Sequence, residues 1–195
     1  MMWQPITTVI LAGGQGTRIG GDKGLRCLHE RPLIAWVLDA IRSQSDEVLV
    51  SANSGRDEYA YLGCPIIADQ TPGWAGPLAG LQSGLRCARN NSVASVPCDT
   101  PFLPTDLLAR LYAAINKASA EAAVAVVEGR RQPTIALYRK NVLPKLDDYL
   151  DSGARKVGGW LDTLQVSEVV FDDAAAFINI NSSEELAAAN QTHKP

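Results

Sequence analysis

The chain has 195 residues, of which 46% are hydrophobic and 20% are charged, and its formal net charge is −3. This length and composition are typical of one globular domain with a substantial core, so we expect a single domain over residues 1–195. The slightly acidic balance argues against a general nucleic-acid-binding protein, which needs a basic surface.

The segment 8–23, TVILAGGQGTRIGGDK, holds the first predicted strand and the most informative motif of the chain. Its apolar start predicts a buried strand, and the glycines that begin at Gly13 predict a turn after that strand. A glycine-rich turn exposes backbone N–H groups to a phosphate, and Arg18 and Lys23 add positive charge beside it. We therefore expect a loop that holds the triphosphate of a nucleotide, with a plain strand-to-helix turn as the alternative.

Two better-known phosphate-binding loops do not fit this segment. The P-loop pattern G-x-x-x-x-G-K-[ST] nearly matches from Gly16 to Gly21, but Asp22 stands where the pattern requires Lys. A dinucleotide-binding pattern G-x-G-x-x-G that starts at Gly14 meets Ile19 where its third glycine belongs. The loop is therefore neither a P-loop nor a dinucleotide-binding loop.

Strand-like and helix-like segments alternate through the rest of the chain. Further strands are predicted at 47–52, 65–68, 93–96, 123–127, 132–138, 167–171 and 177–180. Helices are predicted at 32–41, at 77–87, from an N-cap at Thr105 through Ala118, at 142–150, at 155–161, and after the capping box at 182–185. This alternation predicts an α/β domain with a mostly parallel sheet and helices on both faces.

Polar residues follow several of the predicted strands, and the carboxyl ends of parallel strands share one edge of a sheet. The glycine segment follows the first strand, Ser51 to Asn53 end the second, Asp69 ends the third and Asp99 follows the fourth. We therefore expect these residues to gather around one site.

Asp99 is the strongest candidate for a metal ligand. The segment 93–101, VASVPCDTP, places this carboxylate after an apolar strand and between two prolines. Magnesium binds one or two carboxylates together with phosphate oxygens and water, so a carboxylate beside a triphosphate predicts a Mg²⁺ site. The alternative is a turn residue that bonds its own backbone. With Arg18 and Lys23, Asp99 forms the predicted catalytic set.

Three other residues are weaker candidates, and two of them leave more than one interpretation open. Lys23 binds phosphate or is a solvated surface lysine. Asp69 contacts the nucleoside, bridges to the metal through water, or is a turn residue at a strand end. Ser51 offers the nucleoside a single hydroxyl hydrogen bond, without the paired bonds of an amide.

Two pairs of residues in the second half are candidates for the acceptor side. Asn179 and Asn181 alternate with apolar residues, so on a strand both amides would face one side, as a site wall or a second metal ligand. Arg155 and Lys156 form a basic pair that suits an anionic acceptor. The alternatives are polar residues at a strand end for the first pair and solvated side chains for the second.

No histidine is placed to act as a catalytic base. His29 lies in a predicted turn and His193 in the C-terminal tail, so we find no Ser-His-Asp or Cys-His arrangement. A phosphate oxygen that acts as the nucleophile is already largely anionic at neutral pH. Such a reaction needs in-line positioning, Mg²⁺ and cations rather than a general base.

The first residues of the chain do not form a secretory signal. The N-terminal stretch has no basic region, its apolar run breaks at Gly13, and no segment approaches transmembrane length. The four cysteines show no C-x-x-C spacing, so we interpret them as reduced, mostly buried thiols. These observations predict a cytoplasmic protein without a membrane partner.

Several motifs taken together resemble one nucleotidyltransferase family. They are LAGGQGTR from Leu11, GGDKGL from Gly20, GPLAGL from Gly76, CDTP from Cys98, QPTIAL from Gln132 and FININSSEEL from Phe177. This set resembles the molybdenum cofactor guanylyltransferases, of the MobA type, from about Ile10 to Leu186. The chain departs from the family pattern at Ser51, where relatives usually have Asn, and at Gln132, where they often have His.

The resemblance implies a three-layer Rossmann-like nucleotidyltransferase fold. It implies transfer of GMP from GTP to the terminal phosphate of molybdopterin that carries molybdenum, with Mg²⁺ as cofactor and pyrophosphate as the second product. The GTP site would lie in the N-terminal half and the acceptor site in the C-terminal half, at Arg155, Lys156, Asn179 and Asn181. Transient contact with proteins of cofactor biosynthesis or molybdoenzyme maturation is a further implication. The nucleotide-binding positions that the resemblance implies are Leu11, Ala12, Gly13, Gly14, Lys23, Ser51, Asp69 and Asp99, with Asp99 also on Mg²⁺.

Three alternatives to this activity stay open at the level of sequence. The cytidylyltransferase of the same cofactor pathway is expected to carry Ala-Ala-Gly in the first loop and to lack Gly-Pro-Leu-Ala-Gly. Sugar-1-phosphate guanylyltransferases are usually longer chains with an added domain. A non-catalytic nucleotide-binding regulator would keep the glycine segment but would not need Asp99.

Overall fold

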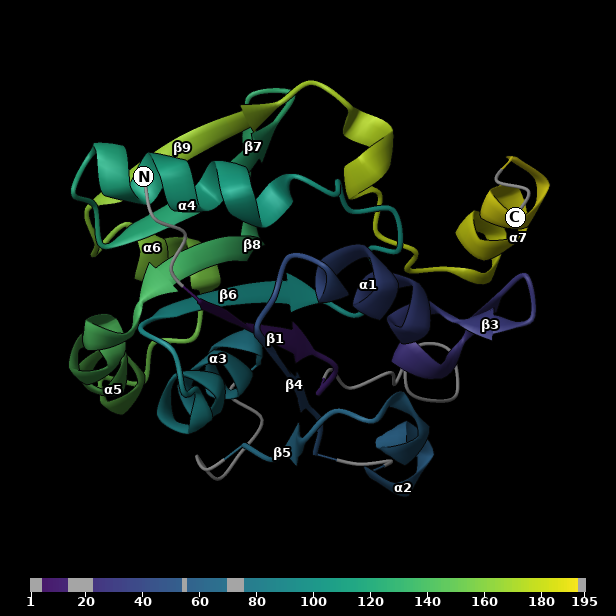
Figure 1. Cartoon of the computed structure of the whole chain (residues 1–195), viewed down its shortest axis with the longest axis horizontal. Coiled ribbons are helices and arrows are strands. Elements are labelled where there is room, and N and C mark those ends of the chain that lie inside the picture. Colours follow the sequence, from purple (N-terminus) through teal and green to yellow (C-terminus); the bar gives the residue numbers. More distant parts are fainter. Residues whose placement is uncertain (1–4, 14–22, 54–55, 70–75, 193–195) are drawn as a thin grey trace.

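The fold is described from a computed structural model of the chain, over residues 5–13, 23–53, 56–69 and 76–192. Within these residues the main feature is a seven-stranded sheet with the strand order β5-β4-β1-β6-β8-β7-β9 (Figure 1). Its strands are β1 (Ile6–Leu11), β4 (Glu47–Ser51), β5 (Ile66–Ile67), β6 (Ser92–Pro97), β7 (Ala122–Val127), β8 (Arg130–Arg139) and β9 (Val166–Phe171). A separate hairpin pairs β2 (Cys27–Leu28) with β3 (Arg31–Pro32).

Helices connect most of these strands. The α-helices are α1 (Leu33–Arg42), α2 (Arg56–Tyr59), α3 (Pro77–Cys87), α4 (Leu107–Lys117), α5 (Leu143–Asp151), α6 (Val157–Leu161) and α7 (Ser183–Thr192). Short 3-10 turns are η1 (Lys23–Leu25), η2 (Ala60–Leu62), η3 (Lys140–Val142) and η4 (Ala174–Phe177). Among the described residues, no helix is long and apolar enough to cross a membrane.

The sheet is mostly parallel, as the alternation of elements predicts. Strand β1 runs parallel to β4 and β6, β4 runs parallel to β5, and β7 runs parallel to β9. Only β8 runs against its neighbours β6 and β7 within the described sheet. The tight turn from β7 to β8 explains this, because Glu128 and Gly129 both have positive φ angles, of 49° and 71°, that suit a two-residue hairpin turn.

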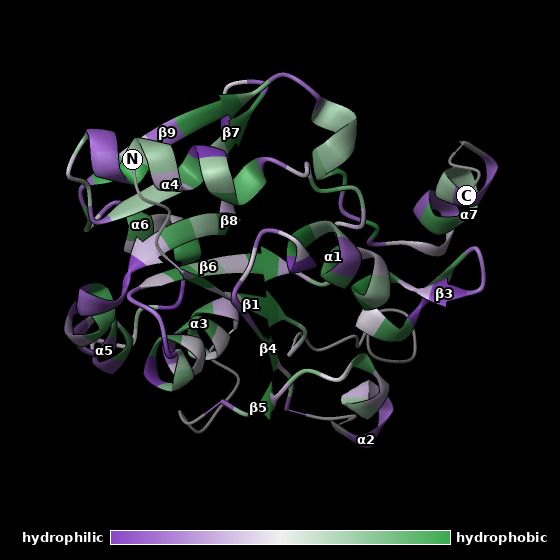
Figure 2. Cartoon of the chain, in the orientation of Figure 1, coloured by the Kyte–Doolittle hydropathy of each residue, from purple (hydrophilic) through white to green (hydrophobic). Residues whose placement is uncertain are grey.

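The core lies in two layers on the two faces of the sheet. Successive residues of a strand point to opposite faces. Accordingly, Ile6 and Ile10 of β1 pack in the cluster that contains the apolar faces of α1 and α4, whereas Val9 packs with α3, α5 and α6. Figure 2 shows mostly hydrophobic central strands, whereas α5 carries both hydrophobic and hydrophilic residues, as an amphipathic surface helix does. The fold is therefore a three-layer α/β sandwich.

The segment 177–180 is not a strand, so that prediction is wrong. After η4 the chain continues in extended form without a strand partner, because the Ile180 N–H donates to the carbonyl oxygen of Asp99 at 2.9 Å. Ile180 is fully buried with Leu28 and Leu33 in a small cluster against which α7 packs. Burying one such side chain contributes about 2 kcal/mol, so this cluster fixes the segment beside Asp99.

The predicted start of the fourth helix also needs a correction. Helix α4 has Asp106 at its N-cap position instead of Thr105, and Asp106 makes no side-chain cap hydrogen bond. The cap comes instead from Gln44, whose Oε1 accepts from the Leu108 N–H at 2.9 Å. The same amide donates to the carbonyl oxygen of Pro104 at 2.9 Å, so a residue beyond α1 satisfies the helix end in place of a local hydroxyl.

The capping box before α7 is confirmed. The Glu185 N–H donates to the Ser182 hydroxyl oxygen, and the Ser182 N–H donates to Glu185 Oε2, both at 3.0 Å. Helix α7 lies beside the β2–β3 hairpin (Figure 1).

The expectation of mostly buried cysteines is wrong. Cys98 alone among the four is buried, Cys64 is half-buried, and Cys27 and Cys87 are exposed. Cys27 lies in the surface hairpin and Cys87 is the last residue of α3, so both positions lie outside the core.

Candidate active site

The carboxyl ends of β1, β4, β5 and β6 meet at one cavity of about 320 Å³. The register of the parallel strands explains the meeting point, because Leu11 pairs with Ser51 on one side and with Pro97 on the other. The cavity is lined by Leu11, Ala12, Gly13, Lys23, Ser51, Asp69, Gly76, Pro77, Gly80, Pro97, Cys98, Asp99, Thr134, Asn179 and Asn181. The predicted gathering of the four strand ends is therefore found in the structure.

The backbone that follows β1 forms part of the cavity wall. The Ala12 N–H donates to the Ser51 carbonyl oxygen at 2.8 Å, and the Cys98 N–H donates to the Leu11 carbonyl oxygen at 3.2 Å. These bonds extend the sheet pairing past the last residue of β1 and hold residues 11–13 in place. Gly14 and Arg18, which belong to the predicted glycine segment, lie outside the described residues.

Helix α3 approaches the sheet closely because two of its residues are glycines. A Cβ atom on Gly80 would lie 2.5 Å from Ser51 Oγ and 3.0 Å from Leu11 Cδ2. A Cβ atom on Gly84 would lie 2.4 Å from Val9 Cγ2. This packing brings the start of α3, at Pro77, to the cavity wall. The positive end of a helix dipole favours an anionic ligand at such a position.

Lys23 and Asp99 form an ion pair in the cavity wall. The Nζ atom of Lys23 lies 3.5 Å from Asp99 Oδ2 and donates to Asn181 Oδ1 at 2.8 Å. The Lys23 side chain is 34% exposed and the Asp99 side chain 10%. Burial raises the pKa of Asp99 above its ordinary value, and the nearby Lys23 ammonium partly opposes that shift.

The second oxygen of Asp99 fits a divalent cation. Its Oδ1 atom is buried and has no hydrogen-bond partner among the described residues. A buried carboxylate oxygen without a partner is costly, and a metal ion satisfies it. The described residues contain no group of three or more His, Cys, Asp or Glu side chains suited to a metal. Asp99 would therefore act as a single protein carboxylate beside phosphate oxygens and water, which is how Mg²⁺ is usually held at a nucleotide.

Asn179 and Asn181 both line the cavity although they do not lie on a strand. The Thr100 hydroxyl donates to Asn179 Oδ1, and the Asn181 N–H donates to Glu185 Oε2 at 2.6 Å. The extended segment runs beside residues 99 and 100, so alternate residues still face the same side. The predicted grouping of the two amides therefore appears through a different local structure.

Asp69 lies at a second position in the wall, beyond the end of β5. The Asn53 side chain donates through Nδ2 to Asp69 Oδ2 at 2.7 Å and accepts the Asp69 N–H at 2.9 Å. The Ser51 hydroxyl donates to Asp69 Oδ1 over a longer distance of 3.4 Å. These contacts tie Asp69 to the end of β4, whereas Lys23 and Asp99 pair with each other and contact the segment 180–181.

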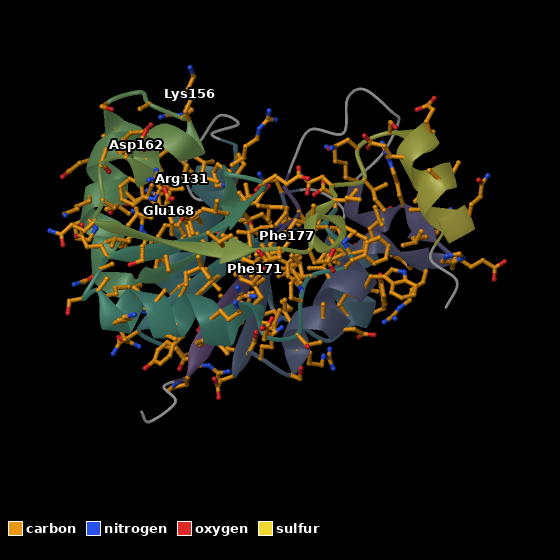
Figure 3. All side chains as sticks on the ribbon, turned by 90° about the horizontal axis from the view of Figure 1, so that it is seen from above. Arg131, Lys156, Asp162, Glu168, Phe171 and Phe177 are labelled. Atoms are coloured by element: carbon orange, nitrogen blue, oxygen red, sulfur yellow. The ribbon has the colours of Figure 1, made fainter. Side chains whose placement is uncertain are left out.

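The structure does not bring Arg155 and Lys156 to this cavity, because neither side chain lines it. The Arg155 guanidinium donates to the carbonyl oxygens of Leu150 and Ala154, at 2.6 and 2.7 Å, and so closes the end of α5. In Figure 3 the Lys156 side chain projects away from the body of the protein.

Figure 3 also labels Arg131, Asp162 and Glu168, which form a surface ion network. Arg131 of β8 pairs with Asp162 at 2.9 Å and with Glu168 of β9 at 2.7 Å. All three side chains are more than a third exposed, so these pairs are ordinary surface ion pairs that contribute little to stability.

Sequence patterns assign no specific role to three residues at or beside the site, although they place Asn53 at the same strand end as Ser51. Asn53 lies two residues beyond β4, and its proximity to Asp69 depends on how β4 and β5 pair. Thr134 reaches the cavity because β8 runs antiparallel to β6, which brings its carbonyl oxygen within 2.9 Å of the Ser95 hydroxyl. Gly80 appears in the GPLAGL motif, but its steric role requires the distance between α3 and Ser51.

Comparisons with known proteins identify the family to which the chain belongs. The MobA-like NTP transferase domain matches residues 8–166. The molybdenum cofactor guanylyltransferase of Burkholderia ambifaria (strain MC40-6) is 47% identical over 193 residues, which cover 94% of both chains. The protein of the same name from Cupriavidus taiwanensis is 43% identical over 189 residues, covering 94% of this chain and 95% of that protein.

A solved structure of similar fold agrees with this match. Molybdopterin-guanine dinucleotide biosynthesis protein A from Archaeoglobus fulgidus has 25% sequence identity and a TM-score of 0.79, over 95% of this chain and 97% of that chain. The family implies a nucleotide substrate and a divalent metal, in agreement with the cavity and the Asp99 carboxylate. The chain therefore belongs to the MobA-like NTP transferase family of nucleotidyltransferases.

Proposed function

We propose that the chain transfers GMP from GTP to the terminal phosphate of molybdenum-bearing molybdopterin and releases pyrophosphate. The observation that carries this proposal is the cavity wall in which Lys23 and the buried carboxylate of Asp99 lie together, in a chain that is 47% identical to named guanylyltransferases. The reaction forms one bond, from an acceptor phosphate oxygen to the α-phosphorus of GTP. The bond between the α-phosphorus and the bridging oxygen breaks, and its electron pair leaves with pyrophosphate.

The chain's part in this reaction is positioning and charge. The acceptor phosphate is already largely anionic at neutral pH, so the chain needs no general base. The backbone of Gly13 and the start of α3, which both line the cavity, would bind nucleotide oxygens. The Lys23 ammonium, with Arg18 from the glycine segment, would balance the negative charge that grows on the leaving pyrophosphate.

Mg²⁺ is the metal that we propose for Asp99. When bound, it would neutralise triphosphate charge and orient the phosphates for in-line attack. Asp99 would hold it through the carboxylate oxygen that otherwise has no partner, with Asn179 and Asn181 close by in the same wall. Lys23 pairs with Asp99 at 3.5 Å, which supports the proposal that the ammonium group and the metal held by Asp99 would act on the same phosphates.

Asp69 is proposed to bind the nucleoside. Its carboxylate accepts hydrogen bonds and donates none, and it is tied to Ser51 and Asn53 instead of to the Lys23–Asp99 pair. Guanine presents two adjacent donors, N1–H and the N2 amino group, to such a carboxylate, whereas cytosine and adenine present acceptors beside a single amino group. A site built to accept two hydrogen bonds rejects a base that lacks them, because its polar groups then stay unpaired.

The acceptor is proposed to enter from the side of the second half of the chain. Asn179, Asn181 and Thr134 supply polar atoms to the cavity there. Lys156, whose side chain is exposed, would attract the anionic acceptor at longer range. Proteins of cofactor biosynthesis or molybdoenzyme maturation are proposed as transient partners that deliver the acceptor or take the product.

The test of this activity is pyrophosphate release from purified chain, molybdopterin carrying molybdenum, Mg²⁺ and one nucleoside triphosphate. Turnover with GTP, and little with CTP or ATP, supports the proposal. Preference for CTP would instead assign the cytidylyltransferase activity. Turnover only when a sugar 1-phosphate replaces molybdopterin as the acceptor would assign a sugar-1-phosphate guanylyltransferase. GTP binding without turnover under any of these conditions would leave a nucleotide-binding regulator.

A further inference from the structure

We infer that Asn53 is a positioning residue of the nucleotide site, which holds the Asp69 carboxylate in the orientation that binds GTP. This inference rests on the proposed function and assigns a role to a residue outside the sequence motifs. Asn53 follows β4 by two residues, and Asp69 follows β5 by two residues. The side chain of Asn53 therefore bridges the ends of two neighbouring strands at the cavity.

The geometry leaves the Asp69 carboxylate little freedom. The Asn53 amide contacts both the side chain and the backbone of Asp69, at 2.7 and 2.9 Å, so its donor and its acceptor are both engaged with one residue. The hydroxyl of Ser51 lies at 3.4 Å from the other carboxylate oxygen, which is close to the limit of a hydrogen bond. Asn53 is thus the main restraint on the orientation of this carboxylate.

The surroundings of Asn53 argue for a role in binding rather than in the core. The residue is exposed, so its side chain contributes little hydrophobic burial. Its Nδ2 atom lies 3.5 Å from the position that a Cβ on Gly13 would take, so it also borders the backbone after β1. Asn53 is therefore hydrogen-bonded to Asp69 and lies close to Gly13, and both of these residues line the cavity.

Positioning has a measurable consequence for affinity. A carboxylate that is free to rotate must lose that freedom when it pairs with a ligand, whereas a fixed carboxylate is preorganised. Each hydrogen bond in such a pair, at an exposed position, is worth about a factor of three in an equilibrium constant. Loss of both bonds should weaken GTP binding about tenfold, with little change in kcat, because the reacting phosphates lie with Lys23 and Asp99.

Two variants test the inference by calorimetric titration with GTP and Mg²⁺. Asn53→Ala removes both bonds and should raise the Kd for GTP about tenfold, raise KM by a similar factor, and reduce the preference for GTP over ATP. Asn53→Asp keeps the shape and the acceptor oxygen but places a second carboxylate against Asp69. Besides Asp69, the charged side chains that line the described part of the cavity are Lys23 and Asp99.

The Asn53→Asp variant also supplies a pH readout that a merely structural role would not produce. Two carboxylates at hydrogen-bond distance share a proton more readily as the pH falls, and the shared proton restores a bond like the one that the amide made. GTP affinity of Asn53→Asp should therefore be more than tenfold weaker than wild type at pH 8 and recover several-fold by pH 5.5. The wild-type chain in the same buffers corrects for titration of the nucleotide itself.

Asn141→Asp is the matched control for charge. Asn141 is an exposed residue beside Ser92, where β6 begins, at the opposite end of the sheet from the cavity. The Asn141→Asp variant should bind GTP with the affinity of the wild type at every pH. A wild-type chain that does not bind GTP overturns the proposed function. A wild-type chain that binds GTP, with Asn53→Ala and Asn53→Asp unchanged in affinity and pH response, overturns the role of Asn53 alone.

Discussion

The Nζ atom of Lys23 lies 3.5 Å from Oδ2 of Asp99, so a residue that follows the glycine segment pairs with the carboxylate that follows β6. The two residues are 76 positions apart in sequence and belong to different loops at the same edge of the sheet. Asn181 accepts a 2.8 Å hydrogen bond from Lys23 and donates its N–H to Glu185 in α7, while the Ile180 N–H donates to the Asp99 carbonyl oxygen. The C-terminal segment therefore holds the pair in place.

Replacement of Lys23 by Met should abolish most of the activity while leaving the fold intact. The variant keeps the unbranched side chain but removes the cation that balances charge on the leaving pyrophosphate. A lost charge stabiliser of this kind typically costs a factor of about 10²–10³ in kcat/KM. The measurement is pyrophosphate release with GTP, with the melting temperature as a check on folding. Lys117→Met, in the last turn of α4, is the control and should react as the wild type does.

Replacement of Asp99 by Asn should change how stability depends on pH. The folded-state pKa of Asp99 is raised above its ordinary value of 3.8 because the carboxylate is buried. The carboxyl group is therefore most compatible with the fold below pH 3.8, and this contribution is lost as the pH rises through the raised pKa. Relative to Asp99→Asn, the wild type should lose stability over that pH range.

Urea unfolding of both proteins without metal, in steps from pH 4 to pH 7, measures this difference. The stability of the wild type minus that of Asp99→Asn should decrease as the pH rises and then level off. Added Mg²⁺ with GTP should stabilise only the wild type appreciably, because Asn lacks the charge that the metal requires. A difference that grows in favour of the wild type with rising pH, without metal, would contradict the buried-carboxylate assignment.

Substitutions of Gly80 and Gly84 in α3 should affect GTP affinity and the free energy of unfolding differently. Gly84→Ala places a methyl group against Val9 in the core and should cost about 1–3 kcal/mol in the free energy of unfolding, as overpacking usually does. Gly80→Ala places its methyl group against the Ser51 hydroxyl in the cavity wall and should mainly weaken GTP binding. Chemical denaturation and GTP titration of both variants test this division.

Each glycine variant has a rescue that depends on the same geometry. Val9→Ala should recover part of the stability lost in Gly84→Ala, and Ser51→Ala should recover part of the GTP affinity lost in Gly80→Ala. Failure of both rescues would mean that α3 does not pack on the sheet at the distance described.

Arg155 and Lys156 should behave differently although they are neighbours. Arg155 hydrogen-bonds carbonyl oxygens at the end of α5, so Arg155→Ala should lower the melting temperature by a few degrees and leave the KM for GTP unchanged. Lys156 has an exposed side chain, and Lys156→Ala should raise the KM for the acceptor about fivefold through lost electrostatic attraction. Steady-state kinetics with the acceptor varied at saturating GTP separates the two. Equal effects on the acceptor KM would contradict this division.

Local sequence patterns predict most of the fold because the strands and helices here follow apolar periodicity. Helix α3 begins at Pro77 and ends at Cys87 as its apolar spacing indicates. The failures occur where tertiary contacts replace local ones. Gln44, in the turn after α1, caps α4 in place of Thr105, and the Ile180 N–H bonds to Asp99 instead of to a neighbouring strand.

The residues of the candidate site also differ in how far the sequence predicts their positions. Residues placed directly after strands, such as Asp69 and Asp99, are predictable because parallel strands end at a common edge. Asn53 depends on a side-chain pairing across two strand ends, and the placement of Arg155 depends on the carbonyl groups at the end of α5. Neither arrangement follows from composition or spacing.

A crystal structure of the chain with GTP and Mn²⁺ in place of Mg²⁺ tests most directly whether one triphosphate joins the strand ends. The anomalous scattering of Mn²⁺ locates the metal independently of the refined coordinates. We expect the metal within coordination distance, about 2.2 Å, of an Asp99 carboxylate oxygen. The phosphates should lie between that metal, Lys23 and the backbone of residues 11–13. A metal bound to the triphosphate but away from Asp99, or a triphosphate outside this cavity, would contradict the account.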